Sequence, residues 1–347
     1  MNVHNKLFQK KKILIYGIGK SGISSYYFLK KTNQIYLYDD NKYLFNKRHL
    51  KKIFIKKESI NKIKFDYIVI SPGININNCN LKNYLKKNNK KIITDLDIFY
   101  SHYSNNKIIA ITGTNGKSTT AKILHNILIN SKADSRLCGN IGNPILLEKK
   151  IFKKTIFVIE ISSYQIDYCK IFKSNYSMIL NISIDHLERH GSIKNYVDAK
   201  FKLVKNQSKN DFAFLNIKNK YLKKILKKNK IDSKIINVNN QLIKKIKKKI
   251  TNSYFLTIGN QENLSFILSI SKKLNLKNKI ILKTINSFKS LKFRQEVIYS
   301  SDKFTCINDS KSTSFASSIN ALQSLQKVYW IVGGIPKLGD DFSLNKK

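Results

Sequence analysis

The sequence predicts an α/β fold made of parallel sheets in three consecutive units. Short apolar stretches alternate with helical stretches along most of the 347 residues, which is typical of parallel α/β sheets. The 13 glycines gather mainly where an apolar stretch ends. Two of these clusters, at residues 17–22 and 113–116, lead directly into a helical stretch, as in nucleotide-binding turns.

The first unit is expected at residues 1–100 and begins with an apolar strand at 12–18. A glycine turn and a helical stretch to about residue 31 follow, and then strands at 35–40 and 66–73. A mixed, polar segment near residues 94–106 is expected to form the boundary with the next unit.

The second unit is expected at residues 101–287. It opens with the strand at 107–112 and contains further buried strands at 157–163, 176–183 and 211–217. The lysine-rich segment at 218–250 keeps some apolar periodicity, so it is expected to hold helix and strand with a solvated basic face. The third unit, 288–347, is expected to contain strands at 296–301, 304–309 and 328–334 and a helix near 314–326.

The charge balance is strongly positive, with 65 lysines and arginines against 21 acidic residues and a formal net charge of +44. Such an excess often indicates a nucleic-acid or membrane-surface partner. However, only four of the 65 are arginine, and the lysines are spread evenly with abundant asparagine and isoleucine. AT-rich coding alone would produce this composition. We expect no specific nucleic-acid partner, with a functional basic surface as the alternative and weak, salt-sensitive binding in vitro.

Cysteine usage and hydropathy bear on the compartment. Cys79, Cys138, Cys169 and Cys306 show no C-x-x-C or zinc spacing, which suits a reducing cytoplasm. No apolar run reaches the ~18 residues of a membrane span. The first apolar stretch runs into glycines, as a strand and turn would, and not as a secretory signal. We expect a cytoplasmic protein without membrane insertion that acts as a monomer.

The strongest motif is ITGTNGKST at residues 111–119, between a strand and a helix. Its two glycines allow backbone N–H groups to turn inward, where the helix N-terminus favours phosphate. The lysine supplies a charge to the β and γ phosphates, and a hydroxyl of Ser118 or Thr119 can bind Mg²⁺. The motif predicts an ATP site made by Gly113, Thr114, Asn115, Gly116, Lys117, Ser118 and Thr119.

A second glycine turn, Gly17, Gly19 and Gly22, follows the first strand, and Asp39 lies at the end of the next strand. Three interpretations remain open: a dinucleotide site, a site for the diphosphate of a nucleotide-linked substrate, and a purely structural turn. The Ser-Pro-Gly turn at 71–73 closes a later strand at the same carboxyl edge, where such sheets bind ligands.

Glu160, His186 and Lys200 are further candidates for the site around the phosphate loop. Glu160 ends an apolar strand on the edge of the phosphate loop, where a carboxylate can bind Mg²⁺ or simply face solvent. His186 follows another strand and is as compatible with a structural role as with a catalytic one. Lys200 is, on pattern alone, one surface lysine among many.

The motifs together resemble the Mur ligase family, and within it the branch that adds D-glutamate. GIGKSG, SPGI, TGTNGKST, CGNIGNP, EISSYQ, LNISIDHLERHG with AK at 199–200, NDSKSTS and GGIPK occur in the family's order from residue 17 to 337. The resemblance implies a UDP-substrate-binding domain, an ATP-binding central domain and a Rossmann-like C-terminal domain. It implies that ATP, UDP-N-acetylmuramoyl-L-alanine and D-glutamate give an amide, ADP and phosphate through an acyl phosphate, in peptidoglycan precursor synthesis.

The resemblance also implies roles for individual residues. It places uridine diphosphate at Gly19, Lys20, Ser21, Asp39, Ser71, Pro72 and Gly73. It assigns phosphate binding to Lys117, a first Mg²⁺ to Ser118 and Glu160, and substrate binding and catalysis to Asn140, Gln165 and His186. A second Mg²⁺ is expected at His186 and Lys200, the latter carbamylated. Nucleotide and substrate contacts are expected at Asn260, Asn263, Arg294, Asp309, Lys311 and Thr313, and D-glutamate near Lys337.

The sequence departs from the family pattern in three places. Phe293 and Gly259 stand where family members often carry histidines near the adenine. The third unit is expected to be incomplete, because family members continue through more strands and helices that carry part of the D-glutamate pocket. Two alternatives stay open: a sister amide ligase, which the UDP-type turns disfavour, and a nucleotide-binding protein without turnover.

Overall fold

The apolar stretch near the N-terminus becomes an inner strand of a four-stranded parallel sheet in the computed structural model, which describes residues 7–41, 43 and 50–335. Ile13, Leu14 and Ile15 have no exposed surface, as expected for a parallel strand covered on both faces. The strand order is β2-β1-β3-β4, with strands β1 (Lys12–Tyr16), β2 (Gln34–Tyr38), β3 (Tyr67–Ile70) and β4 (Ile92–Ile93). Its helices and 3-10 turns are α1 (Lys20–Leu29), η3 (Lys51–Ile53), α2 (Lys57–Ile60), α3 (Lys82–Lys87), η4 (Asn89–Lys91) and α4 (Asp95–Tyr103).

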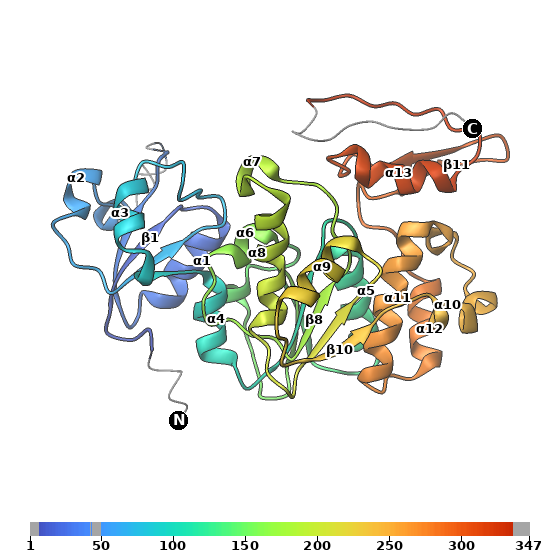
Figure 1. The fold of residues 1–347 in the computed structure, drawn as a ribbon, viewed down its shortest axis with the longest axis horizontal. Helices are drawn as coiled ribbons and strands as arrows, with labels where there is room; N and C mark the ends of the chain where they lie inside the picture. Colours follow the sequence, from blue (N-terminus) through green and yellow to red (C-terminus); the bar gives the residue numbers. More distant parts are fainter. Residues whose placement is uncertain (1–6, 42, 44–49, 336–347) are drawn as a thin grey trace.

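A second, six-stranded parallel sheet lies in the middle of the molecule, with the strand order β10-β9-β8-β5-β7-β6 (Figure 1). Its strands are β5 (Lys107–Thr112), β6 (Ser135–Gly139), β7 (Ile156–Glu160), β8 (Tyr176–Ile179), β9 (Phe212–Leu215) and β10 (Lys234–Asn237). Its helices are α5 (Lys117–Asn130), α6 (Ser163–Asp167), α7 (Leu187–His190), α8 (Ile193–Lys205), α9 (Lys220–Lys228), α10 (Gln241–Ile246), α11 (Ile258–Lys273) and α12 (Asn278–Asn286), with the turns η5 (Ile145–Leu147), η6 (Lys247–Lys249) and η7 (Ser253–Leu256). The helices and strand predicted within 218–250 are thus confirmed.

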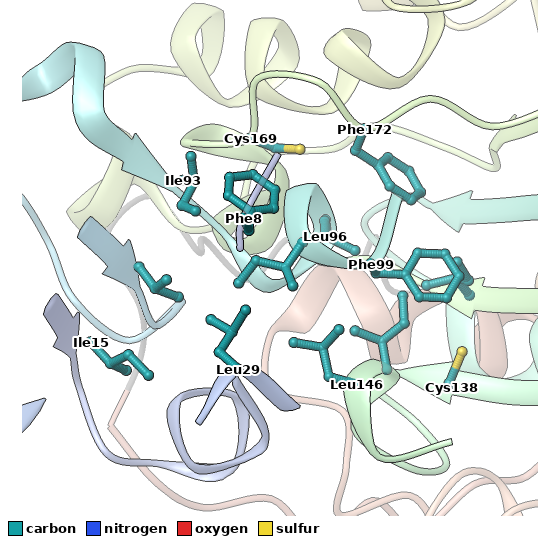
Figure 2. Packing of buried hydrophobic residues seen from close by; sticks show 14 of the residues in the cluster. Phe8, Ile15, Leu29, Ile93, Leu96, Phe99, Cys138, Leu146, Cys169 and Phe172 are labelled. Carbon is teal, nitrogen blue, oxygen red and sulfur yellow. The ribbon is translucent and has the colours of Figure 1, made fainter. Parts of the chain in front are cut away.

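Helix α4 lies where the sequence predicts a polar boundary, yet it is buried between the two sheets. Leu96 and Phe99 have no exposed surface and pack among residues of both units (Figure 2). Each such side chain contributes about 1.5–3 kcal/mol by burial. The buried carboxylate of Asp97 accepts the backbone N–H groups of Lys170 at 2.9 Å and Ile171 at 2.7 Å. The polar residues of the segment therefore fasten the helix to the second unit.

The described part of the third unit, up to residue 335, holds a two-stranded antiparallel hairpin, β11 (Glu296–Ser300) and β12 (Thr305–Asn308). It is followed by α13 (Phe315–Ser324) near α11 (Figure 1). The prediction of a strand at 328–334 is wrong. This stretch has no regular structure, and Tyr329 and Ile331 are 99% and 98% exposed. A strand needs a neighbour to complete its backbone hydrogen bonds, and none of the described strands pairs with it.

Across the described residues, no helix combines the length and the apolar character that crossing a membrane requires.

Candidate active site

The phosphate loop joins β5 to α5 and has the backbone that its glycines predict. Gly113 and Gly116 adopt φ values of +155° and +82°, a region that favours glycine. A Cβ on Gly116 would lie 1.9 Å from Oδ1 of Asn263, so the α11 side chain packs directly against the loop. The first-turn N–H groups of α5 have no partners within their own helix, which leaves them available to an anion.

Asn181, which follows β8, holds the loop in shape. Its backbone oxygen accepts the N–H of Thr114 at 3.0 Å, and its Oδ1 accepts the N–H of Asn115 at 2.8 Å. Lys117 Nζ lies along the loop and donates to the carbonyl oxygens of Gly113 at 2.9 Å and Thr114 at 2.7 Å. The loop is therefore preorganised by its own protein contacts.

Lys200 lies on α8, buried against the same loop and only 1% exposed. Its Nζ donates to the carbonyl oxygen of Gly113 at 2.9 Å and lies 4.6 Å from the ring centre of Tyr196. Burial, and then the charge of Lys117, lower the pKa of Lys200 well below its ordinary value, although Asp185 and Glu160 oppose this shift. A neutral, nucleophilic amine at this position is the form that reacts with an electrophile.

Glu160 lies at the end of β7 and has no exposed surface. Its Oε1 accepts the side-chain N–H of Asn140 at 3.0 Å, whereas its Oε2 is buried without a hydrogen-bond partner. An orphaned carboxylate oxygen beside a phosphate loop is the donor that Mg²⁺ prefers. The loop hydroxyl of Ser118, 5% exposed, is a second oxygen donor in this region.

Glu160 and Ser118 offer two oxygen donors, and Mg²⁺ in such sites takes its other ligands from water and phosphate. In the part of the chain that the structure describes, no three His, Cys, Asp or Glu side chains gather into a metal-binding cluster. An amine such as that of Lys200 is a poor Mg²⁺ ligand, but a carbamate on it would add two oxygens. The residues present fit Mg²⁺ through Glu160 and Ser118, and fit a second ion only with Lys200 modified.

His186 occupies a sharp turn after β8, with φ of +55°. Its Nδ1 lies 2.8 Å from the hydroxyl of Tyr164, and its Nε2 lies 3.5 Å from a carboxylate oxygen of Asp185. Burial raises the pKa of Tyr164 to about 12, so at neutral pH the phenol keeps its proton. Gln165 is 5% exposed and uses its Oε1 to accept the N–H of Ser162, which closes the N-terminus of α6.

The first glycine turn lies at the carboxyl edge of the other sheet. Gly22 must be glycine, because a Cβ there would lie 1.9 Å from the backbone oxygen of Gly17. Ser71 Oγ donates to that same oxygen at 2.5 Å. Asp39 accepts the N–H of Ile18 at 2.6 Å, so its carboxylate supports the turn. Gly19 precedes α1 without a side-chain cap, and Lys20 and Ser21 form its first turn.

Asp95 is a buried carboxyl that the sequence did not single out, 3% exposed at the start of α4. Burial raises its pKa to about 6, while a hydrogen bond from Ser21 opposes that shift and the charge of Asp97 adds to it. Its Oδ1 has no hydrogen-bond partner. The carboxyl therefore links α4 to the turn at 17–22.

Stability should reflect this raised pKa. Between an unfolded pKa of 3.8 and a folded pKa of about 6, the folded chain holds a proton that the unfolded chain releases. The free energy of unfolding therefore falls as pH rises through this window. The asparagine of Asp95→Asn cannot titrate. The free energy of unfolding of this variant should therefore fall less across the window than that of wild type, by up to about 3 kcal/mol. Urea unfolding across this range measures the slope, with the exposed Asp302→Asn as control; equal slopes in wild type and Asp95→Asn would contradict the expectation.

The residues expected at the adenine end gather around Tyr254. Asn260 donates to the backbone oxygen of Tyr254 at 2.8 Å, and the Tyr254 hydroxyl lies 3.4 Å from Thr119 Oγ1 on α5. Burial raises the pKa of Tyr254, the charge of Asp309 adds to this shift, and the charge of Arg294 opposes it. Lys311 and Thr313 are exposed in the third unit, and Lys337 lies outside the described residues.

The structure thus brings the phosphate loop, Glu160, Lys200 and Asn263 together, while the UDP-type turns lie on the other sheet. Sequence reasoning missed three residues with structural contacts here. Asn181 holds the phosphate loop, Tyr164 lies beside His186, and Arg189 donates to backbone oxygens of Pro72 and Ile74. Asparagine and tyrosine are too common here to attract notice, but the scarcity of arginine could have marked Arg189.

Comparison with known proteins gives consistent matches. The family described as "Mur ligase middle domain" matches residues 111–283. UDP-N-acetylmuramoylalanine–D-glutamate ligase of Rickettsia prowazekii is 34% identical, over 96% of this chain and 78% of the relative. The ligase of the same name from Clostridioides difficile is 31% identical, over 96% and 79%. The crystal structure of MurF ligase from Thermotoga maritima in complex with ADP shares the fold, with a TM-score of 0.53 at 14% identity, over 94% of this chain and 76% of that one.

Proposed function

The chain belongs to the Mur ligase family, and on that premise we propose that it joins D-glutamate to UDP-N-acetylmuramoyl-L-alanine at the expense of ATP. The curated relatives that carry this activity in their names match almost the whole chain at 31–34% identity. The structural observation that carries the proposal is the convergence at one sheet edge of the phosphate loop, the orphaned carboxylate of Glu160 and the buried amine of Lys200. These groups suit phosphoryl transfer.

The proposal divides the work among the three units. Residues 1–100 bind the UDP part of the substrate through the turns at 17–22 and 71–73. Residues 101–287 bind ATP, with Asn260 and Asn263 near the adenine and ribose. Residues 288–347 bring D-glutamate, which is proposed to lie near Lys337. In the same unit, Arg294 and Asp309 are proposed to contact the nucleotide, and Lys311 and Thr313 the substrate. Uridine diphosphate and ATP are both polyanions, so both proposed sites use helix N-termini.

The chemistry follows from the weakness of a carboxylate as an electrophile. An oxygen of the alanine carboxylate attacks the γ-phosphorus of ATP, and ADP leaves. The D-glutamate amine then attacks the carbonyl carbon of the acyl phosphate, loses a proton, and phosphate leaves. Lys117 and the N–H groups of α5 stabilise charge on the transferred phosphoryl group. Asn140 and His186 are proposed to orient the substrate carboxylate.

Mg²⁺ would be held by Ser118 and Glu160, and a second ion by His186 and a carbamylated Lys200. The metal would neutralise phosphate charge as the phosphoryl group moves. Carbamylation fits the surroundings of Lys200, because burial keeps its amine neutral and able to add to carbon dioxide. The proposal places this chemistry in the cytoplasm, where ATP and nucleotide-linked precursors occur.

D-glutamate dependence tests the proposal directly. Purified protein with ATP, Mg²⁺ and UDP-N-acetylmuramoyl-L-alanine should release phosphate only when D-glutamate is added, and mass spectrometry should find one amide per phosphate. L-alanine and L-lysine serve as matched acceptors. Equal release with these amino acids would reject the D-glutamate assignment and favour a sister ligase.

A further inference from the structure

Arg189 is the side chain that reaches from the catalytic turn of the second sheet to the substrate turn of the first. It lies on α7, three residues after His186. Its Nη2 donates to the carbonyl oxygen of Ile74 at 2.5 Å and lies 3.3 Å from that of Pro72. These carbonyls belong to the loop after β3. A single guanidinium thus joins the two candidate sites.

The guanidinium is held on its other side by aromatic rings. Its central carbon lies 5.1 Å from the ring centre of Tyr164 and 5.6 Å from that of Tyr168. The Tyr164 hydroxyl is also the group that lies 2.8 Å from His186 Nδ1. The guanidinium is therefore attracted to the same ring whose hydroxyl lies beside the histidine.

Composition supports a specific need for arginine here. Only four of the 65 basic residues in the chain are arginine, so an arginine at this position stands out against the composition. Arg136, a second example, contacts two carboxylates and two backbone carbonyl oxygens. A lysine at 189 would offer one compact ammonium, which cannot span a carbonyl and stack flat on tyrosine in the same way.

The contacts continue from the histidine to the phosphate loop. The rings of His186 and Tyr196 lie 6.2 Å apart, and the Tyr196 hydroxyl lies 3.1 Å from Thr114 Oγ1. A continuous set of side chains therefore connects the ATP loop with the substrate turn at 71–74. Such a set of contacts makes these residues candidates for coupling between the two sites.

We propose that Arg189 is a positioning residue that sets the substrate turn at 71–74 against the turn carrying His186, and so couples UDP-substrate binding to nucleotide binding. This role rests on the proposed function for the identity of the two ligands. The contacts of Arg189 are with backbone oxygens and tyrosine rings. Its effect is on where the first sheet holds the substrate relative to the second.

Calorimetric titration of Arg189→Lys tests the role without requiring turnover. UDP-N-acetylmuramoyl-L-alanine is titrated with and without a non-hydrolysable ATP analogue and Mg²⁺. We expect about tenfold weaker binding of the UDP substrate, because hydrogen bonds to a charged donor are lost. The ATP analogue alone should bind within about twofold of wild type. Wild type should show coupling of about fivefold or more between the two ligands, and the variant should show almost none.

Arg136→Lys is the matched control, because its contacts stay within the second unit. It should leave both affinities and their coupling unchanged. Tyr164→Phe keeps the ring beneath the guanidinium and removes only the hydroxyl, so it should lower kcat while retaining UDP-substrate affinity.

Three outcomes decide the proposal. UDP-substrate binding and coupling as in wild type would overturn it. If Arg189→Lys weakened the binding of the UDP substrate and of the ATP analogue equally, the proposal would also be overturned, since that pattern indicates a general structural role. The expected binding pattern in a protein that shows no D-glutamate-dependent turnover would support the role of Arg189 and reject only the proposed function.

Discussion

Replacing Lys200 with alanine is expected to lower D-glutamate-dependent phosphate release by about a thousandfold or more, as for the loss of a group that stabilises transition-state charge. Lys200 is buried against the phosphate loop, within hydrogen-bond distance of Gly113. Burial lowers the pKa of its amine, which favours reaction with carbon dioxide over protonation. The resulting carbamate would supply anionic oxygens for the second metal ion of the proposed function.

Chemical rescue separates this role from a packing role. Acetate or another small carboxylate should restore part of the turnover of Lys200→Ala, and removal of bicarbonate should slow the wild type but not the variant. Lys202→Ala is the matched control on the same helix, since the Lys202 ammonium donates to the backbone oxygen of Asp167, away from the loop. Wild-type turnover of Lys200→Ala without any additive would reject the carbamate.

The two glycine turns could be predicted from the sequence because their backbone conformations require glycine at particular positions. Gly22 and Gly116 have no room for a Cβ, and in a chain with only 13 glycines each such position is conspicuous. The parallel strands could be predicted because strands covered on both faces are apolar throughout, as Ile13 to Ile15 are.

The remaining features depend on contacts between distant segments. The segment of helix α4 is polar in sequence because Asp95 and Asp97 begin it, but both carboxylates are buried in the fold. That of Asp97 accepts backbone N–H groups of Lys170 and Ile171, far along the chain. The apolar side chains of residues 328–334 predict a strand. A strand also needs a neighbouring strand for its backbone hydrogen bonds, and no described strand pairs with this stretch. Lys200 has the sequence context of a surface lysine and is 1% exposed, since only the fold turns its face of α8 toward the loop.

Glu160→Gln is expected to lower turnover without lowering the stability of the ligand-free protein. The carboxylate of Glu160 is buried with one oxygen unpartnered, which is a costly way to hold a charge. The amide keeps the shape and the oxygen that accepts from Asn140. We expect the free energy of unfolding without ligands to stay equal or to rise by up to about 2 kcal/mol. Turnover should fall by about a hundredfold or more, because a charged ligand to Mg²⁺ is lost.

Thermal unfolding with and without Mg²⁺ and a non-hydrolysable ATP analogue measures both the stability of the ligand-free protein and the stabilisation by the ligands. The ligands should raise the Tm of wild type by much more than they raise the Tm of Glu160→Gln, since stabilisation by a ligand follows its affinity. Glu148→Gln is the reciprocal control: its carboxylate lies 3.6 Å from Arg136 Nε and only 6% of its side chain is exposed. That variant should lose stability and keep turnover. A Glu160→Gln protein that loses stability and retains Mg²⁺-dependent turnover would show instead that Glu160 supports the fold and binds no metal.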